Sequence, residues 1–116
     1  MSKISVVVSA YNEEKNIEDC LRSIKDIADE IIIVDGSSTD KTVEIAKSYG
    51  AKVTVTTNPP IFHINKQKSF DLATGHWILY LDADERVNKQ LGSEILEIIN
   101  MDQSKIAEYQ TKLKKK

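Results

Sequence analysis

Two aspartates separated by one residue, Asp82 and Asp84, follow an apolar run in the segment WILYLDADE. In an extended chain both side chains point to the same side, where neighbouring carboxylates repel each other and a divalent cation relieves that repulsion. Mg²⁺ and Mn²⁺ prefer oxygen ligands and often lie between one or two carboxylates and the phosphates of a substrate. The pair therefore indicates a metal site for a phosphorylated ligand. The alternative is two solvated turn residues.

Other polar residues stand at the ends of two earlier apolar runs. Tyr11 and Glu13 follow the first run, and Asp35 ends the second. Tyr11 offers a ring on which a base can stack, and Glu13 offers a carboxylate to ribose hydroxyls. The alternatives are a loop tyrosine packed on a helix and, for Asp35, a simple strand-end residue. We interpret Asp40 as the cap of the following helix rather than as a ligand.

Five further residues are of types that can take part in chemistry. Lys66 and Lys68 could meet a diphosphate, and a solvated helix face explains them equally well. His63 stands alone in a proline-rich loop, and its surroundings in the sequence give no reason to make it catalytic. Trp77 begins an apolar run and Cys20 falls on the apolar face of a helical pattern, so both are predicted to be core residues.

The elements that must position these residues follow from the periodicity of the apolar side chains. Short, valine- and isoleucine-rich runs typical of buried parallel strands occur at residues 4–9, 30–34, 52–56 and 77–81. Helical spacing predicts helices from residue 13 to about 27, and over residues 40–49, 66–73 and 89–99. Asn12 is the predicted N-terminal cap of the first of these helices.

Alternation of strand and helix predicts a mainly parallel sheet with helices on both faces. Right-handed crossovers then favour the strand order 3-2-1-4. In such a sheet, ligands bind outside the carboxyl ends of the strands, where the winding direction reverses. Three polar clusters that are far apart in sequence should therefore meet at one edge. If the sheet ends at its fourth strand, that strand leaves a bare edge, and we expect either self-association or poor solubility.

Composition narrows the class of protein. The chain has 116 residues, which suffice for one domain with a modest core, and a net charge of −2, which offers no long-range attraction to nucleic acid. No apolar run approaches the ~20 residues that span a bilayer, and the run ending at Ala10 is too short for a signal peptide. With a single cysteine, we expect a cytoplasmic protein. The lysine-rich end allows peripheral contact with the inner face of a membrane.

Three stretches, in this order and spacing, resemble family 2 glycosyltransferases of the GT-A fold: ISVVVSAYNEEKNIEDCLRSI, EIIIVDGSSTDKTVEIA and ATGHWILYLDADERV. The relatives most similar in pattern act on lipopolysaccharide cores and cell-surface glycans and share the form LDADE. The resemblance reaches about Ile99. It implies an α/β, Rossmann-like three-layer sandwich that is truncated after the Asp-x-Asp strand. A nucleotide-sugar-binding domain would cover residues 1–100, and a polar, lysine-rich tail residues 101–116.

The resemblance also implies an activity and a site. The expected activity is inverting transfer of a sugar from a nucleotide-diphosphate donor, UDP-linked, to a glycan or lipid-linked acceptor, with Mg²⁺ or Mn²⁺. The nucleotide-binding positions would be Ala10, Tyr11, Asn12, Glu13, Asp35, Lys68 and Asp82. The metal positions would be Asp84 and Asp82, with Asp84 favoured as the direct ligand.

The sequence departs from the family pattern in three places. Gly36 stands where many relatives carry a second acidic residue that contacts the base, and the stretch between Asn65 and Gly75 is shorter than in many members. Relatives continue for about a hundred residues more, which supply the acceptor site and the catalytic base. No base is assigned here, because Glu94, Glu97 and Asp102 fit an ordinary amphipathic surface.

Two alternatives to a glycosyltransferase remain open. A non-catalytic module that binds a nucleotide or nucleotide sugar is consistent with the missing acceptor half. A response-regulator-like domain is suggested by the strand-end Asp35. That class needs clustered acids at the first strand and a lysine after the last strand. Glu13 and Glu14 imitate the first requirement poorly, because Tyr11 and Asn12 intervene.

Overall fold

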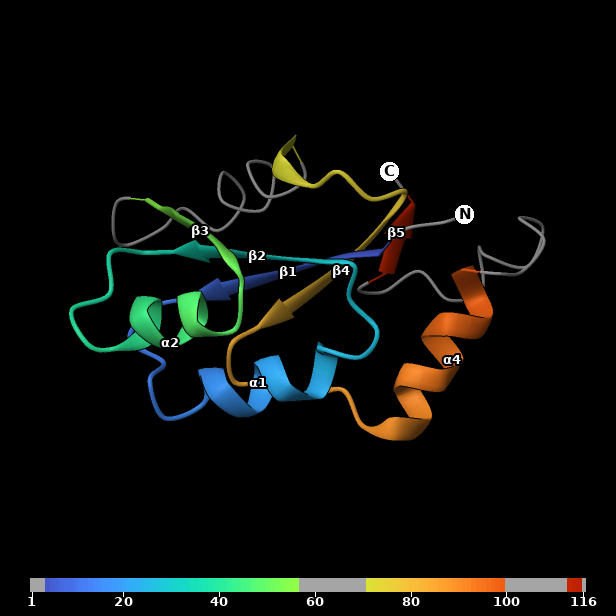
Figure 1. Cartoon of the computed structure of the whole chain (residues 1–116), viewed down its shortest axis with the longest axis horizontal. Helices are drawn as coiled ribbons and strands as arrows, with labels where there is room; N and C mark the ends of the chain where they lie inside the picture. The colour runs from blue at the N-terminus through green and yellow to red at the C-terminus, as the bar shows by residue number, and fades with distance from the viewer. Residues whose placement is uncertain (1–3, 57–70, 100–112, 116) are drawn as a thin grey trace.

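A single five-stranded sheet organises the computed structural model, which describes residues 4–56, 71–99 and 113–115 (Figure 1). The strands are β1 (Ile4–Ala10), β2 (Glu30–Asp35), β3 (Lys52–Val55), β4 (Trp77–Asp82) and β5 (Leu113–Lys115). The helices are α1 (Ile17–Ile24), α2 (Thr42–Ser48) and α4 (Lys89–Ile99). The spatial order is β3-β2-β1-β4-β5. The first four strands are parallel and confirm the predicted order 3-2-1-4.

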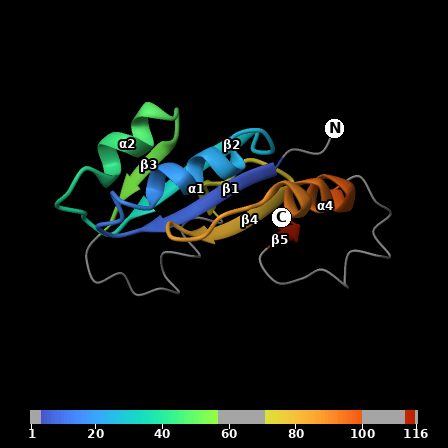
Figure 2. The same ribbon diagram turned by 90° about the horizontal axis from the view of Figure 1, so that it is seen from below.

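The two faces of the sheet are covered differently. All three described helices lie on one face, where Val6 and Val8 of β1 join a large buried cluster with Leu21 of α1 (Figure 2). On the other face, Val7 belongs to a smaller cluster that includes Ala73. Both predicted core residues are confirmed. Cys20 and Trp77 are buried in the larger cluster.

Crossover handedness explains this arrangement. The chain steps from β1 through α1 to β2 and through α2 to β3 in one direction, and right-handed connections keep both helices on the same face. β4 lies on the opposite side of β1 from β3, and a right-handed connection between these two strands requires the other face. Ala73, shortly before β4, packs on that face. The helix predicted over residues 66–73 lies mostly outside the described residues. Only Asp71 and Leu72 are seen to be helical.

The first helix starts later than the sequence predicts. It begins at Ile17 rather than at Glu13, and the Glu13 carbonyl accepts hydrogen bonds from the N–H groups of Asn16 (3.0 Å) and Ile17 (2.8 Å). The prediction that Asn12 caps this helix is wrong. Asn12 has φ +50°, and its Oδ1 accepts a hydrogen bond from Thr39 N at 2.8 Å. Short polar side chains bond readily to nearby backbone, and here the neighbouring loop takes the place of the helix end.

The edge of β4 is also different from the expectation. Residues Trp77 to Leu79 pair antiparallel with β5, so the predicted bare edge is wrong over this stretch. Unpaired N–H and C=O groups on an edge strand are a template for pairing, and residues of the predicted tail supply the partner. The outer strands of the sheet are therefore β3 and β5. Among the described helices, none has both the length and the apolar character to cross a bilayer.

Candidate functional site

The strand register brings the predicted acids to one edge of the sheet. Ala10 of β1 lies opposite Asp35 of β2, and Ser9 of β1 lies opposite Asp82 of β4. Neighbouring strands are about 4.8 Å apart, so the Asp35 and Asp82 backbones flank β1 at a separation of roughly 10 Å. The predicted meeting of the clusters is thus confirmed at the level of the backbone. It occurs beside β1, where the winding direction reverses.

The Asp-x-Asp pair lies on a tight turn, residues 82–85, which begins at Asp82, the last residue of β4. Glu85 N donates to the Asp82 carbonyl at 2.9 Å, and Asp82 N donates to Glu85 Oε1 at 2.8 Å. Asp82 and Asp84 are exposed, whereas Ala83 between them is 1% exposed. The hydrogen bond from Glu85 N to the Asp82 carbonyl bends the chain, so the chain does not stay extended through both aspartates. Burial of Ala83 still keeps both aspartates out of the core.

The turn is anchored to α1 by contacts that the sequence did not reveal. Arg86 Nη2 donates to Asn16 Oδ1 at 3.3 Å and lies 3.7 Å from Asp19 Oδ2. Val87 N donates to Ser23 Oγ at 3.0 Å. The only signal in the sequence was an arginine next to an acidic run. These contacts join the aspartate turn to both ends of α1, so the pair rests on a regular element rather than on a free loop.

Cys20 of α1 lies directly beneath this turn. Its Sγ is 3.9 Å from the Asp82 carbonyl oxygen. Burial raises the pKa of the thiol to about 11, Arg86 partly opposes this, and Glu85, Asp84 and Asp82 add to it. The thiol is therefore protonated at neutral pH and acts as a small core residue.

The donor set of the turn determines which kind of metal it fits. The turn presents two carboxylates, and no group of three or more His, Cys, Asp or Glu residues within the described part of the chain could form a metal cage. Mg²⁺ and Mn²⁺ commonly accept one or two carboxylates and complete their shell with phosphate oxygens and water. Asp82 and Asp84 therefore fit a hard divalent cation that is shared with a phosphorylated ligand.

On the other side of β1, Asp35 connects two loops through Ser38. The Asp35 side chain is 1% exposed, and its Oδ1 and Oδ2 accept hydrogen bonds from Ser38 Oγ (2.5 Å) and Ser38 N (2.8 Å). Ser38 Oγ in turn accepts a hydrogen bond from Asn12 N at 2.8 Å. The loop after β2 is thus linked to the loop after β1. In the sequence, the run of short polar residues SSTDKT after Asp35 and Gly36 is the feature that indicates this role.

A second link joins the same loops one turn further on. Asp40 Oδ1 accepts hydrogen bonds from Thr42 N (2.9 Å) and Thr42 Oγ1 (2.5 Å). Asp40 thus satisfies the first N–H group of α2, although the N-cap residue of this helix is Lys41 and not Asp40 as predicted. Asp40 Oδ2 accepts from Glu14 N at 3.2 Å, and Glu13 N donates to Thr42 Oγ1 at 2.9 Å. Burial on its own raises the pKa of Asp40, but the hydrogen bonds from Thr42 and Glu14 lower it overall.

Two residues of these loops have a left-handed backbone. Asn12 has φ +50° and Ser37 has φ +66°, a conformation that is uncommon for residues other than glycine. Cross-loop hydrogen bonds hold both of them, since Ser37 Oγ donates to the Thr56 carbonyl. Such strain persists only where the surroundings over-determine it, and it clusters at ligand sites. Both strained residues lie at the edge where Asp35 and Asp82 meet.

The remaining predicted residues fall in four groups. Tyr11 is 41% exposed at the end of β1, which does not support the alternative of a ring packed on a helix. Ala10 is buried and its carbonyl accepts Gly36 N at 2.9 Å. On α4, Glu94 and Glu97 are exposed, as predicted. His63, Lys66, Lys68 and Asp102 lie outside the described residues.

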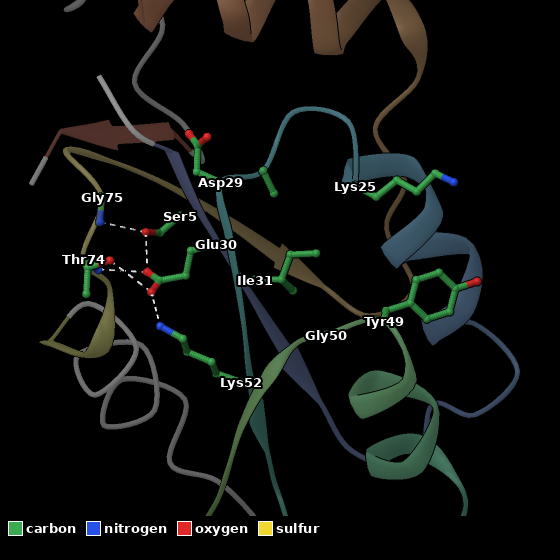
Figure 3. A pocket seen from close by; sticks show the side chains of 11 residues that line it. Ser5, Lys25, Asp29, Glu30, Ile31, Tyr49, Gly50, Lys52, Thr74 and Gly75 are labelled. Atoms are coloured by element: carbon green, nitrogen blue, oxygen red, sulfur yellow. Dashed lines mark hydrogen bonds and ion pairs between the residues drawn. The ribbon is translucent and has the colours of Figure 1, made fainter. Parts of the chain in front are cut away.

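A second polar cluster lies at the opposite, amino edge of the sheet, beside a hollow of about 470 Å³ (Figure 3). Its centre is Glu30, whose Oε1 accepts from Ser5 Oγ (2.7 Å) and Thr74 N (2.9 Å). Glu30 Oε2 accepts from Lys52 Nζ (2.7 Å) and Thr74 Oγ1 (3.0 Å). Ser5 Oγ also accepts from Gly75 N at 2.9 Å. Neither Glu30 nor Ser5 was singled out in the sequence, although both are polar residues inside apolar strands.

The Glu30 cluster has the properties of a structural fastening. Burial on its own raises the pKa of Glu30, but hydrogen bonds from Lys52, Thr74 and Ser5 lower it to about 2. Every buried side-chain nitrogen and oxygen atom in the described residues has a hydrogen-bond partner. The hollow also lies at the amino ends of the strands, away from the edge at which ligands bind in open α/β sheets. We therefore assign the candidate site to the carboxyl edge.

Comparison with known sequences places this site in a wider context. A family model described as glycosyl transferase family 2 matches residues 5–112. A protein of Rickettsia bellii named uncharacterized glycosyltransferase is 46% identical over 114 residues, which cover 96% of this chain and 38% of the relative. Glycosyltransferase SunS from the SPbeta prophage of Bacillus subtilis is 35% identical over 97 residues, covering 82% and 23%. The chain thus spans about two fifths or less of these relatives.

Two solved structures share this arrangement of strands and helices with the chain. S. aureus TarS, residues 1–349, has a TM-score of 0.74 and 30% identity, over 84% of this chain and 32% of that one. Glucosyl-3-phosphoglycerate synthase from Mycobacterium tuberculosis was crystallised with Mn²⁺, UDP and glucosyl-3-phosphoglycerate. It has a TM-score of 0.63 and 28% identity, over 73% of this chain and 36% of that one.

Proposed function

The chain belongs to glycosyl transferase family 2, and from this premise we propose that it binds a UDP-linked sugar donor at the carboxyl edge of its sheet for inverting transfer to a glycan or lipid-linked acceptor. One observation carries the proposal. The register places Asp35 and Asp82 on either side of the end of β1, with Asp82 and Asp84 exposed on one turn. The complex of the mycobacterial synthase with UDP and Mn²⁺ supports a nucleotide and a divalent metal in this fold.

In this proposal the two loops on the Asp35 side hold the nucleoside. Tyr11 is exposed and offers its ring to the base, while Glu13 is half-buried beside it and offers a carboxylate to ribose hydroxyls. The Asp35 carboxylate fixes the loop after β2 by accepting two hydrogen bonds from Ser38. The complete proposed nucleotide set is Ala10, Tyr11, Asn12, Glu13, Asp35, Lys68 and Asp82.

The aspartate turn supplies the other half of the donor site. Asp84 and Asp82 would hold Mg²⁺ or Mn²⁺, which neutralises diphosphate charge and stabilises the departing nucleotide when bound. The protein's own contribution is to keep both carboxylates on the solvent side, because Ala83 is buried and Glu85 closes the turn. Arg86 and Val87 then fix the turn against α1, so the carboxylates do not have to be ordered when the ligand arrives.

The proposed reaction is a single displacement. A base removes the proton of an acceptor hydroxyl, whose oxygen forms a bond to the anomeric carbon as the bond from that carbon to the diphosphate oxygen breaks. We assign no base. A cell-envelope glycan or a lipid-linked glycan is the proposed acceptor, and the proposed location is the cytoplasm, including the inner face of the membrane. With a net charge of −2, nucleic acid is not proposed as a partner.

The experiment that tests this proposal is calorimetric titration of UDP into the protein with and without Mn²⁺. We expect binding that requires both the metal and Asp84, so that Asp84→Ala no longer responds to Mn²⁺. Asp26→Ala is the matched control, because Asp26 is an exposed aspartate of the turn after α1, far from the carboxyl edge. It should bind as the wild type does.

Three results would count against the proposal in different ways. Folded wild-type protein that binds no UDP would contradict the nucleotide site. Binding that is indifferent to Mn²⁺ or to Asp84→Ala would contradict the metal site alone. Metal-dependent binding without sugar transfer to any glycan or lipid-linked acceptor would favour the alternative of a non-catalytic nucleotide-binding module.

A further inference from the structure

The Ser38 hydroxyl has an unusual position between the two loops of the nucleoside side. It donates to Asp35 Oδ1 at 2.5 Å and accepts from Asn12 N at 2.8 Å, while Ser38 N donates to Asp35 Oδ2 at 2.8 Å. A serine hydroxyl has a single proton to donate. That proton is committed to Asp35, so Ser38 affects a ligand through the groups that it holds.

Both of those groups need this partner. Asp35 is 1% exposed, and a buried carboxylate that loses a donor bears a large desolvation penalty. Asn12 is in the left-handed region, and its N–H group points to Ser38 while its Oδ1 accepts from Thr39 N. Without the Ser38 hydroxyl, Asn12 can relax toward a common backbone conformation. Its neighbours Tyr11 and Glu13 would then move with it.

The support of the aspartate turn is separate. Residues 82–87 are held by Arg86 to Asn16 and by Val87 to Ser23, and none of these bonds includes Ser38 or Asp35. A change at Ser38 can therefore disturb the nucleoside side and leave the metal side in place. This separation makes a positioning role distinguishable from a general loss of structure.

We propose that Ser38 is a positioning residue for the nucleoside half of the donor, and that it sets affinity for the uridine part and not for the diphosphate part. The inference rests on the function proposed above. It adds a residue whose hydroxyl touches no ligand and acts through Asp35 and the Asn12 backbone.

The test compares two probes, UDP and inorganic pyrophosphate, each titrated in the presence of Mn²⁺. In Ser38→Ala we expect UDP affinity to fall about tenfold, because a hydrogen bond to a charged group is lost. Pyrophosphate affinity should not change. Ser38→Thr retains the hydroxyl and should bind UDP like the wild type. Ser93→Ala is the matched control, because Ser93 is exposed on α4.

Circular dichroism establishes that each variant is folded before it is titrated. If Ser38→Ala is unfolded, Ser38→Cys provides the same test, because the thiol has a similar shape but is a weak donor. Unchanged UDP affinity in a folded Ser38→Ala or Ser38→Cys variant overturns the inference, and so does an equal loss for UDP and pyrophosphate. If the wild-type protein itself fails to bind UDP, both the proposed function and this inference are overturned. If the wild type binds UDP and only the Ser38 results differ from those expected, the inference alone is overturned.

Discussion

The two edges of the sheet both carry clusters of polar side chains, but they are built in opposite ways. At the amino edge, Glu30 accepts four hydrogen bonds from Ser5, Thr74 and Lys52, and the cluster satisfies itself (Figure 3). At the carboxyl edge, Asp82 and Asp84 are exposed on a turn, and the backbone of Asn12 is strained.

This difference separates a structural cluster from a candidate site. The hollow of about 470 Å³ lies at the amino edge, where the buried polar groups of the described residues already have hydrogen-bond partners. The carboxyl edge combines exposed carboxylates, a strained backbone and rigid support from α1. In this molecule, exposed carboxylates and strained residues that the fold holds in place indicate the functional site better than the presence of a hollow does.

Removal of the aspartate pair should produce the largest effect on binding. In the double variant Asp82→Asn with Asp84→Asn, we expect metal-dependent UDP affinity to fall by at least about 100-fold, since both proposed oxygen ligands lose their charge. The free energy of unfolding should stay the same or rise, because two neighbouring like charges are removed. Calorimetry and urea unfolding measure the two quantities. A large loss of stability would show that this edge is structural as well.

Glu30→Ala should produce the reverse pattern. Its removal leaves the donors of Ser5, Thr74 and Lys52 without their shared acceptor, and we expect a loss of about 2–3 kcal/mol in the free energy of unfolding. Urea unfolding measures this loss, with Glu97→Ala on the exposed face of α4 as the control. UDP affinity of the folded variant should match the wild type. A decrease in that affinity would mean that the two edges are coupled.

The amino edge should also make stability depend on acid pH. The pKa of Glu30 is lowered from 4.5 to about 2 by its hydrogen bonds, so the stability it contributes is complete above about pH 4.5. This contribution is lost as the pH falls from about 4.5 toward 2, and amounts to about 1–2 kcal/mol after solvent screening of Lys52. Urea unfolding of the wild type and Glu30→Gln over this range tests the expectation. The variant should lack this part of the pH dependence, and parallel curves would contradict it.

Arg86→Gln should have the smallest effect, because it loosens the aspartate turn without removing a carboxylate. Arg86 Nη2 contacts Asn16 and lies near Asp19, and exposed pairs of this kind contribute about 0.2–1 kcal/mol. We expect a loss of roughly threefold in metal-dependent UDP affinity. Arg22→Gln is the control, because it breaks an exposed ion pair with Glu18 within α1. This variant should bind UDP as the wild type does. Equal effects in both variants would argue against support of the turn.

Handedness and periodicity made much of the fold predictable. The apolar runs of β1 and β4 and the reversal in winding direction were sufficient to place Asp35 and Asp82 at the same edge of the sheet. The burial of Cys20 also followed from local spacing. These features depend on neighbouring residues or on one rule of chirality, and both can be read along the chain.

Contacts between distant segments were decided only by the tertiary structure. Asn12 was expected to cap its own helix but bonds to Ser38 and Thr39 of another loop, because a short polar side chain has several partners of similar energy. Residues Trp77 to Leu79 of β4 pair with β5, although the sequence predicted an unpaired edge there. The four bonds of Glu30 likewise needed three strands and a turn to be assembled first.

The sequence by itself determined which residues arrive at the carboxyl edge, because strand order and chain direction follow from local pattern and chirality. The tertiary structure alone decided how those residues are held. Ser38 reaches Asn12 across 26 positions of sequence, and Arg86 reaches Asn16 across 70. Such bonds form only after packing has brought the loops together, and no local pattern specifies them.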